Sequence, residues 1–285
     1  MKGLPPAIIE KLKMFLEEDI RSGDITTEAL GPLNATGIAT VIAKSRTILA
    51  GVEEAAAIAD LYGITCEVLA FEGNWVGPRE PVIRFKGPAK TLLVVERVVL
   101  NIVMRMSGIA TTTYNMVQSA RKENPKVIVA ATRKTTPGFR YFEKRAVEVG
   151  GGDPHRYALD DMVIIKNNHI AVVGGVAQAI RAARERVSFT KKISCEVRNL
   201  QEAIQAAETG VDIVLLDNFT PKEIENVHTV LTQRGLRARV ILEASGGIDE
   251  SNARAFAKSG VDVISSGALT HSYTSSDFSM SLTLA

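Results

Sequence analysis

The chain has 285 residues, 46% of them hydrophobic and 23% charged, so it can form a sizeable core and extensive disorder is excluded. Its 34 basic and 32 acidic side chains give a formal charge of only +2, which argues against a general nucleic-acid binder and makes any basic patch local. No apolar run approaches the roughly 20 residues of a membrane span. Two cysteines in apolar, strand-like contexts, Cys66 and Cys195, indicate buried thiols and a cytoplasmic location.

The N-terminal half mixes helix and strand patterns without a fixed period. Residues 1–20 have the apolar spacing of an amphipathic helix, best developed over residues 6–19, and their acidic residues are not typical of a signal peptide. Apolar runs then predict strands over residues 37–51, 64–73 and 80–87, and a helix over residues 52–63. Pairs that contain glycine or proline separate the predicted strands. The pattern predicts an α+β sandwich domain over residues 1–108.

A long apolar segment, residues 91–121, predicts a helix that connects the two halves of the chain. Gly108 lies in its interior, and because glycine weakens a helix, we expect the helix to break near that residue. At the other end of the chain, residues 271–285 are expected to return to the N-terminal domain.

From residue 126 onward, short apolar runs and helical patterns alternate with a nearly regular period. The runs predict strands over residues 126–134, 161–169, 192–198, 211–219, 238–247 and 261–269, and the segments between them predict helices over residues 139–151, 175–187, 200–210, 221–235 and 249–260. We expect Gly210, Gly235 and Gly260 to end helices in the left-handed conformation, and Pro221 to begin one. Alternation with short connections predicts a parallel sheet with right-handed crossovers. Six strands are too few for an eight-stranded barrel, so the expected fold is α/β, with an incomplete α/β barrel over residues 109–270.

Each predicted strand of this half turns polar where it ends. The residues concerned are Thr132, Arg133 and Lys134; Lys166, Asn167, Asn168 and His169; Glu196 and Arg198; Asp217 and Asn218; Glu243, Ser245, Gly246 and Gly247; and Ser265, Ser266 and Gly267. In parallel α/β sheets, ligands bind at the carboxyl ends of the strands. Ordinary helix caps and solvated loops could explain one such strand end. Six polar strand ends in succession favour a ring of functional groups around one opening of the predicted barrel.

Two of these strand ends predict a phosphate site. The segments EASGGIDES (residues 243–251) and ISSGALTHS (residues 264–272) place small residues directly after a late strand and before a helix. Without a Cβ, backbone N–H groups can approach a phosphate closely, and the last two strand loops of α/β barrels often form such a site.

Basic residues beside this site predict a substrate with several negative charges. Arg133, Lys134, Arg156 and Lys166 supply the charges, and His155 precedes Arg156 in the glycine-rich segment GGGDPHRYAL, residues 150–159. Arginine binds carboxylates and phosphates through two parallel hydrogen bonds, whereas lysine acts as a mobile point charge. Several such cations could hold two anionic substrates side by side.

The motifs that carry these residues resemble a known family. The segments are EDIRSGDITT, ERVVLN, SGIAT, ATRKTTPG, GGGDPHR, VIIKNNH, LLDNF, EASGG and SGALTHS, in chain order over nearly the whole sequence. They resemble the nicotinate-nucleotide pyrophosphorylases, also called quinolinate phosphoribosyltransferases. The resemblance implies transfer of phosphoribosyl from phosphoribosyl pyrophosphate to quinolinate, with release of pyrophosphate and carbon dioxide and formation of nicotinate mononucleotide for NAD synthesis. It also implies a homodimer or higher homo-oligomer in which the partner's N-terminal half closes each barrel.

The same resemblance assigns roles to individual residues. Arg133, Lys134, His155, Arg156 and Lys166 would bind the quinolinate carboxylates and neighbouring anions, with Arg97 reaching in from the other subunit. Thr132 is a further substrate-binding candidate. Ser245, Gly246, Gly247 and Gly267 would hold the 5-phosphate, and His271 and Lys134 would lie near the pyrophosphate. Ser266 is also a substrate-binding candidate. Asp217 would face the ribose and Mg²⁺, which enters with phosphoribosyl pyrophosphate. Lys134, Lys166 and Asp217 are the catalytic candidates.

One residue departs from the family pattern, because Arg198 stands where the family usually has a second carboxylate. Glu196 lies on the same strand face and could replace that acid or pair with Arg198, and we expect pairing. Three alternatives follow from the sequence: a related transferase with another aromatic acceptor, a lyase that forms a Schiff base on Lys166, and a binding protein without activity. His169 could cap a helix or take part in the site.

Overall fold

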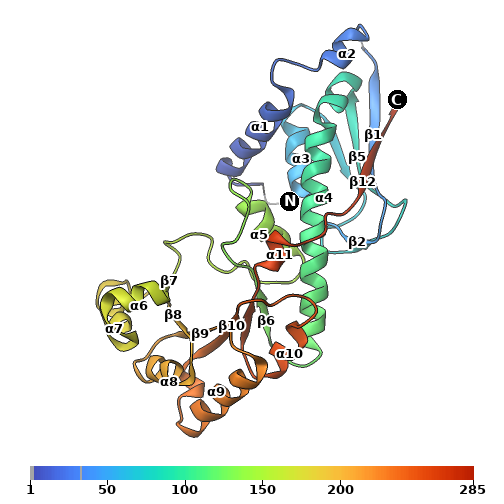
Figure 1. The fold of residues 1–285 in the computed structure, drawn as a ribbon. Helices are drawn as coiled ribbons and strands as arrows, with labels where there is room; N and C mark the ends of the chain where they lie inside the picture. The colour runs from blue at the N-terminus through green and yellow to red at the C-terminus, as the bar shows by residue number, and fades with distance from the viewer. Residues whose placement is uncertain (1–2, 33) are drawn as a thin grey trace. The chain divides into compact units, whose positions relative to one another are not determined.

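The computed structural model of the chain describes residues 3–32 and 34–285 and consists of two compact units. The first unit takes its residues from Met1–Thr112, Thr136–Gly151 and Tyr273–Ala285, and the second from Thr113–Thr135 and Gly152–Ser272. Each unit has its own principal sheet, as the ribbon in Figure 1 shows. Among the described residues, no helix combines the length and the apolar character needed to cross a membrane.

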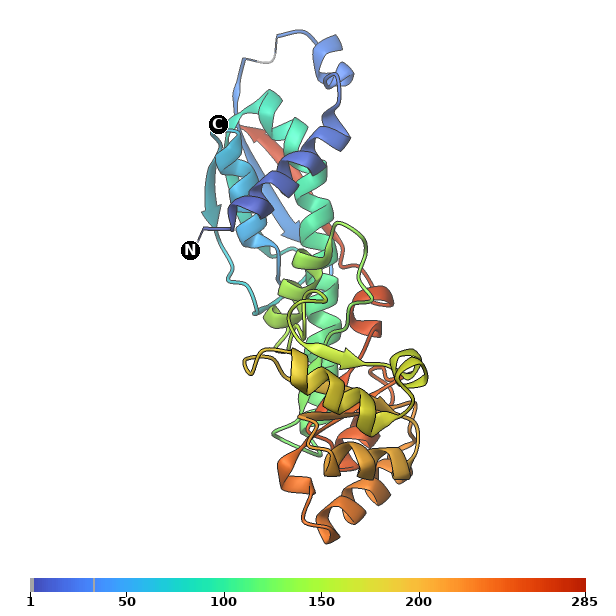
Figure 2. The ribbon, with the colours of Figure 1, turned by 90° about the vertical axis from the view of Figure 1, so that its left-hand side faces the viewer.

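A four-stranded antiparallel sheet forms the framework of the first unit. Its strands in spatial order are β12 (Phe278–Leu284), β1 (Thr36–Ala43), β5 (Pro81–Pro88) and β3 (Thr65–Val68). Buried and more exposed positions alternate along β1, as expected for a strand with one face on the core. Strand β12 lies beside β1 in both ribbon views, red against blue (Figures 1 and 2), with Met280 aligned with Val41. A further short pair consists of β2 (Thr47–Ile48) and β4 (Trp75–Val76).

The helices of the first unit include one long helix that continues into the second. They are α1 (Pro6–Ile20), α2 (Ile25–Ala29), α3 (Val52–Leu61), α4 (Ala89–Arg121) and α5 (Arg140–Val149). The predicted break near Gly108 is wrong, because α4 is continuous through that residue. A Cβ on Gly108 would lie 2.3 Å from the carbonyl oxygen of Thr274 and 2.9 Å from the Cα of Ser275. The C-terminal segment therefore crosses α4 at a distance that leaves no room for a side chain.

Helix α5 belongs to the first unit, although the rhythm of the sequence assigned residues 139–151 to the barrel. Its Phe142 is fully buried and packs against Phe15 of α1, with ring centroids 5.5 Å apart. On another turn of the helix, Arg145 forms ion pairs with α3. These contacts join segments that are far apart in the chain, so local periodicity could not reveal them.

Three carboxylates surround the guanidinium of Arg145. Its Nη2 lies 2.9 Å from Oε2 of Glu53, its Nη1 lies 3.1 Å from Oε2 of Glu54, and Glu72 also pairs with it. The carboxylate of Glu72 additionally accepts the N–H of Gly51 at 2.6 Å, just before α3 begins. Burial and the neighbouring carboxylates raise the pKa of Glu54, which has no exposed surface, to about 7. One cation therefore does not hold all three carboxylates in the charged form at neutral pH.

The second unit is built on a six-stranded sheet in which every pair of neighbours is parallel. The spatial order is β6 (Ile128–Ala130), β11 (Val263–Ser265), β10 (Ile241–Ser245), β9 (Ile213–Asp217), β8 (Ile193–Val197) and β7 (Val163–Ile165). The strands β6 and β7 are the two edges of this order rather than neighbours. The sheet is open between them, so the prediction of an incomplete α/β barrel is confirmed.

Helices connect these strands, as the alternating pattern predicts. They are α6 (Asn167–Val173), α7 (Val176–Arg186), α8 (Leu200–Glu208), α9 (Pro221–Gln233), α10 (Ala253–Lys258) and α11 (Ala268–His271), with a 3-10 turn at Arg237–Arg239. Gly210, Gly235 and Gly260 have φ angles of 84°, 69° and 91°, so each takes the left-handed conformation expected after a helix. Pro221 begins α9, and Thr220 caps that helix by accepting the N–H of Glu223.

The strand register brings polar residues onto one face of the parallel sheet. Aligned residues form one row of Glu196, Leu215, Glu243 and Val263, and a second row of Asp217, Ser245 and Ser265, two residues nearer the carboxyl edge. Because aligned residues of parallel strands point to the same side, the carboxylates of both rows share this face. Glu243 contacts His155 and Glu196 contacts Lys166, so this face meets the loops at the carboxyl edge.

Candidate active site

The carboxyl edge of the parallel sheet gathers every predicted site residue except Arg97. In the order of the strands, Thr132, Arg133 and Lys134 follow β6; Ser266, Gly267 and His271 follow β11; Ser245, Gly246 and Gly247 end or follow β10; Asp217 ends β9; and Lys166 follows β7. His155 and Arg156 come from the loop between α5 and β7, which pairs with β6 through a bridge from Asp153 to Ala130. Arg97 lies on α4 in the first unit, where its side chain is 58% exposed.

Two arginines lie close together at this edge. Burial and the positive charge of Arg133 both lower the pKa of the Arg156 guanidinium. The Nη1 of Arg156 donates to the carbonyl oxygen of Met162 at 3.0 Å, whereas the buried Nε of Arg133 has no hydrogen-bond partner among the described residues. Two neighbouring guanidinium groups repel each other, so this part of the edge favours an anion with two or more acceptor oxygens.

Lys134 and His271 meet around Gly267. A Cβ on Gly267 would lie 2.8 Å from Cδ of Lys134 and 2.9 Å from Nε2 of His271. The Lys134 backbone is held at both of its polar groups, because its N–H donates to Thr132 Oγ1 at 3.0 Å and its carbonyl accepts from Thr270 Oγ1 at 2.8 Å. The absence of a side chain at Gly267 therefore makes room for two groups that can carry positive charge.

Two successive glycines in the left-handed region form the turn after β10. Gly246 has a φ of 101°, and a Cβ there would lie 2.3 Å from Oδ1 of Asn218. Gly247 has a φ of 61°, and a Cβ there would meet nothing within 4 Å, so the backbone borders open space. Ser266 is buried, and its hydroxyl donates to the carbonyl oxygen of Ile248 at 2.6 Å. The side chain of Ser266 thus stabilises this turn.

Lys166 lies at the far edge of the sheet and pairs with Glu196. Its Nζ is 3.4 Å from Oε2 of Glu196, whose Oε1 accepts from the side-chain amide of Asn167 at 2.8 Å. The N–H of Lys166 donates to Nδ1 of His169 at 2.8 Å, so His169 caps the start of α6. The Lys166 side chain is 56% exposed and ion-paired, whereas an imine-forming lysine requires desolvation or a neighbouring cation.

The expected pair between Glu196 and Arg198 is wrong. Arg198 is 58% exposed, and its Nη2 lies 4.0 Å from Glu202 on the following helix turn, while its N–H donates to the other carboxylate oxygen of Glu202 at 2.9 Å. Glu196 is only 9% exposed and turns toward Lys166. Period-two alternation placed both residues on one face, but β8 ends at Val197, so Arg198 no longer follows the strand geometry.

The sequence placed Glu243 among the polar strand ends but gave it no specific role, and it lies in the middle of this face. Its carboxylate is buried, and its Oε1 lies 3.3 Å from Nε2 of His155. The sequence signal that could have revealed this contact is a single acidic residue within an apolar strand. A carboxylate buried in such a strand needs a polar partner, so its position predicts one.

A metal ion would depend largely on the substrate for its ligands. Among the described residues, no group of three or more His, Cys, Asp or Glu side chains is placed to hold one. Asp217 ends β9 next to Ser245, and Glu196 lies on the same face. Magnesium commonly binds through one or two carboxylates together with substrate phosphates, so these residues fit a magnesium ion that arrives on a phosphorylated substrate.

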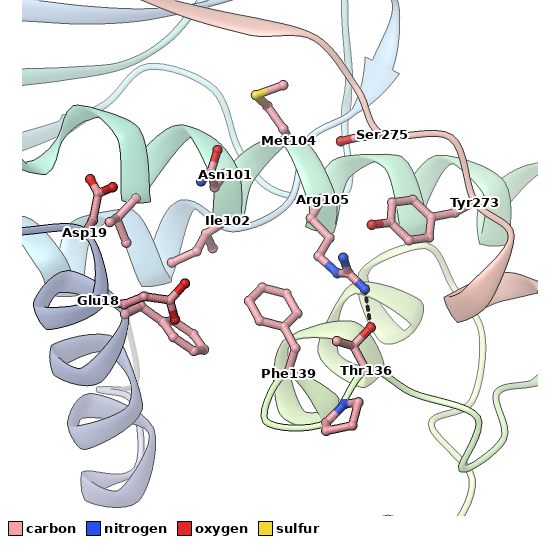
Figure 3. Close-up of a pocket in the computed structure, with 13 residues that line it drawn as sticks. Glu18, Asp19, Asn101, Ile102, Met104, Arg105, Thr136, Phe139, Tyr273 and Ser275 are labelled. Atoms are coloured by element: carbon pink, nitrogen blue, oxygen red, sulfur yellow. Dashed lines mark hydrogen bonds between the residues drawn. The ribbon is translucent and has the colours of Figure 1, made fainter.

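The first unit contains a separate cavity of about 500 Å³, which none of the predicted site residues lines. Figure 3 shows Arg105 of α4 pointing into it between Phe139 and Tyr273, with its guanidinium 5.1 Å from each ring centroid. Arg105 also pairs with the buried carboxylate of Glu143 and donates to Thr136 Oγ1. These contacts hold the segment that begins at Thr136 within the first unit.

An open parallel sheet whose carboxyl edge carries cations beside glycine turns defines an enzyme of the phosphate-binding α/β barrel class. The family models for the N-terminal and C-terminal domains of quinolinate phosphoribosyl transferase match residues 24–107 and 109–281. The chain therefore belongs to the quinolinate phosphoribosyl transferase family.

Individual relatives agree with this assignment. The chain is 44% identical over 275 residues to a probable nicotinate-nucleotide pyrophosphorylase [carboxylating] of Methanothermobacter thermautotrophicus, covering 96% of this chain and 99% of the relative. It is 45% identical over 282 residues to the human nicotinate-nucleotide pyrophosphorylase [carboxylating], covering 98% and 93%. The crystal structure of NadC from Streptococcus pyogenes superposes with a TM-score of 0.92 at 37% identity, with both chains fully covered.

Proposed function

We propose that the protein transfers the phosphoribosyl group of phosphoribosyl pyrophosphate to quinolinate and releases pyrophosphate and carbon dioxide. The product is nicotinate mononucleotide, a precursor of NAD. The observation that supports the proposal is the position of residues 132–134, Lys166 and the glycine turns after strands of one parallel sheet, at its carboxyl edge, with Arg156 close to Arg133. Family membership over nearly the whole chain supports it.

Quinolinate binding is proposed for the cationic part of the edge. The guanidinium groups of Arg133 and Arg156 would each take a carboxylate through parallel hydrogen bonds, with Thr132 and His155 beside them. Lys166 would contribute a third charge, and Glu196 would hold its ammonium toward the face of the sheet. Each close ion pair is worth about 4 kcal/mol at an effective dielectric near 20, before desolvation is counted.

Phosphoribosyl pyrophosphate is proposed to bind across the last two strand ends. The backbone of Ser245–Gly247 and Gly267 would hold the 5-phosphate, because Gly247 borders open space and no Cβ intervenes. Lys134 and His271, which meet at Gly267, would neutralise the pyrophosphate. The carboxylate of Asp217 would face the ribose, where positive charge develops at C1 as pyrophosphate departs.

The chemistry then needs orientation and charge rather than a covalent intermediate. The pyridine nitrogen attacks C1 as the bond to pyrophosphate breaks. When the adjacent carboxylate leaves as carbon dioxide, the electron pair stays on its ring carbon, where the positive pyridinium nitrogen stabilises it, and a proton from solvent then binds to that carbon. Magnesium carried by phosphoribosyl pyrophosphate, with Asp217 as its protein ligand, would neutralise charge on the leaving group. The protein places the two substrates side by side, which offsets the entropy of aligning them.

A homodimer or a higher homo-oligomer with shared sites is part of the proposal. Arg97 has an exposed guanidinium on α4, and its nearest carboxylate oxygen, on Glu96, is 4.0 Å away. It would serve the site of a second copy. A cytoplasmic location is supported by the free thiols Cys66 and Cys195, whose pKa values burial raises to about 11 and about 12.

Purified protein tests the function directly. With quinolinate, phosphoribosyl pyrophosphate and Mg²⁺, we expect equal amounts of nicotinate mononucleotide, pyrophosphate and carbon dioxide. Nicotinate in place of quinolinate is the control, because it lacks one of the two carboxylates that Arg133 and Arg156 would bind. A folded protein that forms no product at any magnesium concentration, or one that prefers nicotinate, would contradict the proposal.

A further inference from the structure

Glu243 is a buried carboxylate at the centre of the parallel sheet. It is the third residue of β10 and only 2% exposed, and its aligned neighbours on the adjoining strands are the apolar residues Leu215 and Val263. Burying a charge in such surroundings is costly unless a hydrogen-bonded partner compensates it. The polar side chain that contacts it among the described residues is His155, with Oε1 of Glu243 at 3.3 Å from Nε2.

Both ring nitrogens of His155 are engaged. Its Nδ1 accepts the backbone N–H of Arg156 at 2.8 Å, which places the ring proton on Nε2, where it faces Glu243. The backbone N–H of His155 donates to Oδ1 of Asp153 at 2.7 Å. With a φ of 54°, His155 takes a left-handed conformation that its neighbours must hold in place.

We propose that Glu243 is a positioning residue, which acts through His155 to fix Arg156 for binding the quinolinate carboxylate. The inference rests on the proposed function and refines it. The imidazole of His155 contacts Glu243 through Nε2 and the backbone of Arg156 through Nδ1. It links the rigid central strand to the backbone of Arg156, so that the guanidinium is held beside Arg133 before the substrate arrives.

The charges that face Arg156 are consistent with this arrangement. Burial has the largest effect on the pKa of Arg156 and lowers it. Among the neighbouring charges, Arg133 has the largest effect and also lowers this pKa, whereas Asp161 and Glu243 raise it. Two neighbouring cations separate unless something holds them, and preorganised groups bind more tightly because they lose less freedom on binding. The contacts from Glu243 to His155 and from His155 to the backbone of Arg156 fix Arg156 relative to the central strand of the sheet.

Substitutions at Glu243 separate this role from a general structural one. Glu243→Gln keeps a hydrogen-bond acceptor of the same shape, and Glu243→Leu removes it. By analogy with other residues that orient a binding group, Glu243→Leu should lower kcat/KM for quinolinate by about 10- to 100-fold. Glu243→Gln should stay within about threefold of the wild type, and the KM for phosphoribosyl pyrophosphate should change little in either variant.

A double substitution tests whether Glu243 acts through His155. His155→Asn tolerates the left-handed backbone but is too short to reach Glu243. The variant Glu243→Leu/His155→Asn should be no worse than His155→Asn alone, since the second change finds no link left to break. Ser194→Ala is the matched control, because Ser194 is fully buried on the same sheet face and its hydroxyl has no hydrogen-bond partner among the described residues.

Nuclear magnetic resonance gives a readout that needs no turnover. The Nε2–H proton of His155, assigned by its loss in His155→Asn, should be visible in the wild type and in Glu243→Gln and absent in Glu243→Leu. If the wild type forms no product, this signal still tests the contact. The inference is overturned if Glu243→Gln and Glu243→Leu are equally impaired, if both substrates are affected alike, if the losses of the single variants multiply, or if the proton survives in Glu243→Leu.

Discussion

Replacing Glu54 with glutamine should stabilise the first unit at alkaline pH. Glu54 has no exposed surface and shares one guanidinium, that of Arg145, with Glu53 and Glu72. Burial raises its pKa from the ordinary 4.5 to about 7, so the folded protein binds this proton more tightly than the unfolded chain. The stabilisation by protonated Glu54 is fully present below pH 4.5 and is lost as the pH rises through about 7.

The size of the effect follows from that difference in pKa. Because the unfolded chain ionises at a lower pH than the folded protein, Glu54 lowers the free energy of unfolding by about 3 kcal/mol at pH 8 and by about 1 kcal/mol at pH 5. Glutamine resembles the protonated acid, so Glu54→Gln should gain about those amounts. Urea unfolding at the two pH values measures them, and the single tryptophan, Trp75 in β4, reports on the first unit by fluorescence.

Glu53→Gln is the matched control for this prediction. Glu53 is 28% exposed and also pairs with Arg145, so its loss removes a charge partner without relieving a buried acid. It should lower the free energy of unfolding slightly at both pH values. A gain for Glu54→Gln that is equal at pH 5 and pH 8, or a loss of stability at pH 8, would refute the reasoning.

Three further predictions concern positions where the structure explains the residue present. Gly246→Ala should raise the KM for phosphoribosyl pyrophosphate at least tenfold, because its Cβ would clash with Asn218. Gly247→Ala, where the new Cβ would meet open space, should lower the free energy of unfolding by only about 1–2 kcal/mol through backbone strain. Steady-state kinetics and urea unfolding compare the two variants. Gly108→Ala should lower the free energy of unfolding by about 3 kcal/mol or more, since the clash is with backbone, and a melting temperature equal to that of the wild type would contradict this. Arg198→Glu should change stability by less than about 0.5 kcal/mol and leave the magnesium dependence of turnover unchanged, because Arg198 is exposed and lies apart from the Lys166–Glu196 pair.

The sequence alone was sufficient to predict the parallel sheet and the polar residues that follow its strands. Strand residues there are short apolar runs bounded by helix caps and glycines, and both signals are local, so the alternation predicted the order of elements. Since all parallel strands end at one edge, the polar residues that follow them had to gather there. Arg133 and Lys166, which follow β6 and β7, could therefore be assigned to this edge from the sequence, whereas Arg156 lies in the loop before β7.

Tertiary structure decided which partners these residues have. Glu196 pairs with Lys166 rather than Arg198, and Glu243 with His155, because distance in space and the end of a strand select the partner, and neither is written in local periodicity. Gly108 shows the same limit, since a glycine that would weaken an isolated helix stays within α4 where another segment crosses closely. Local patterns determine elements and their order, whereas pairing between remote segments depends on packing that only the folded chain defines.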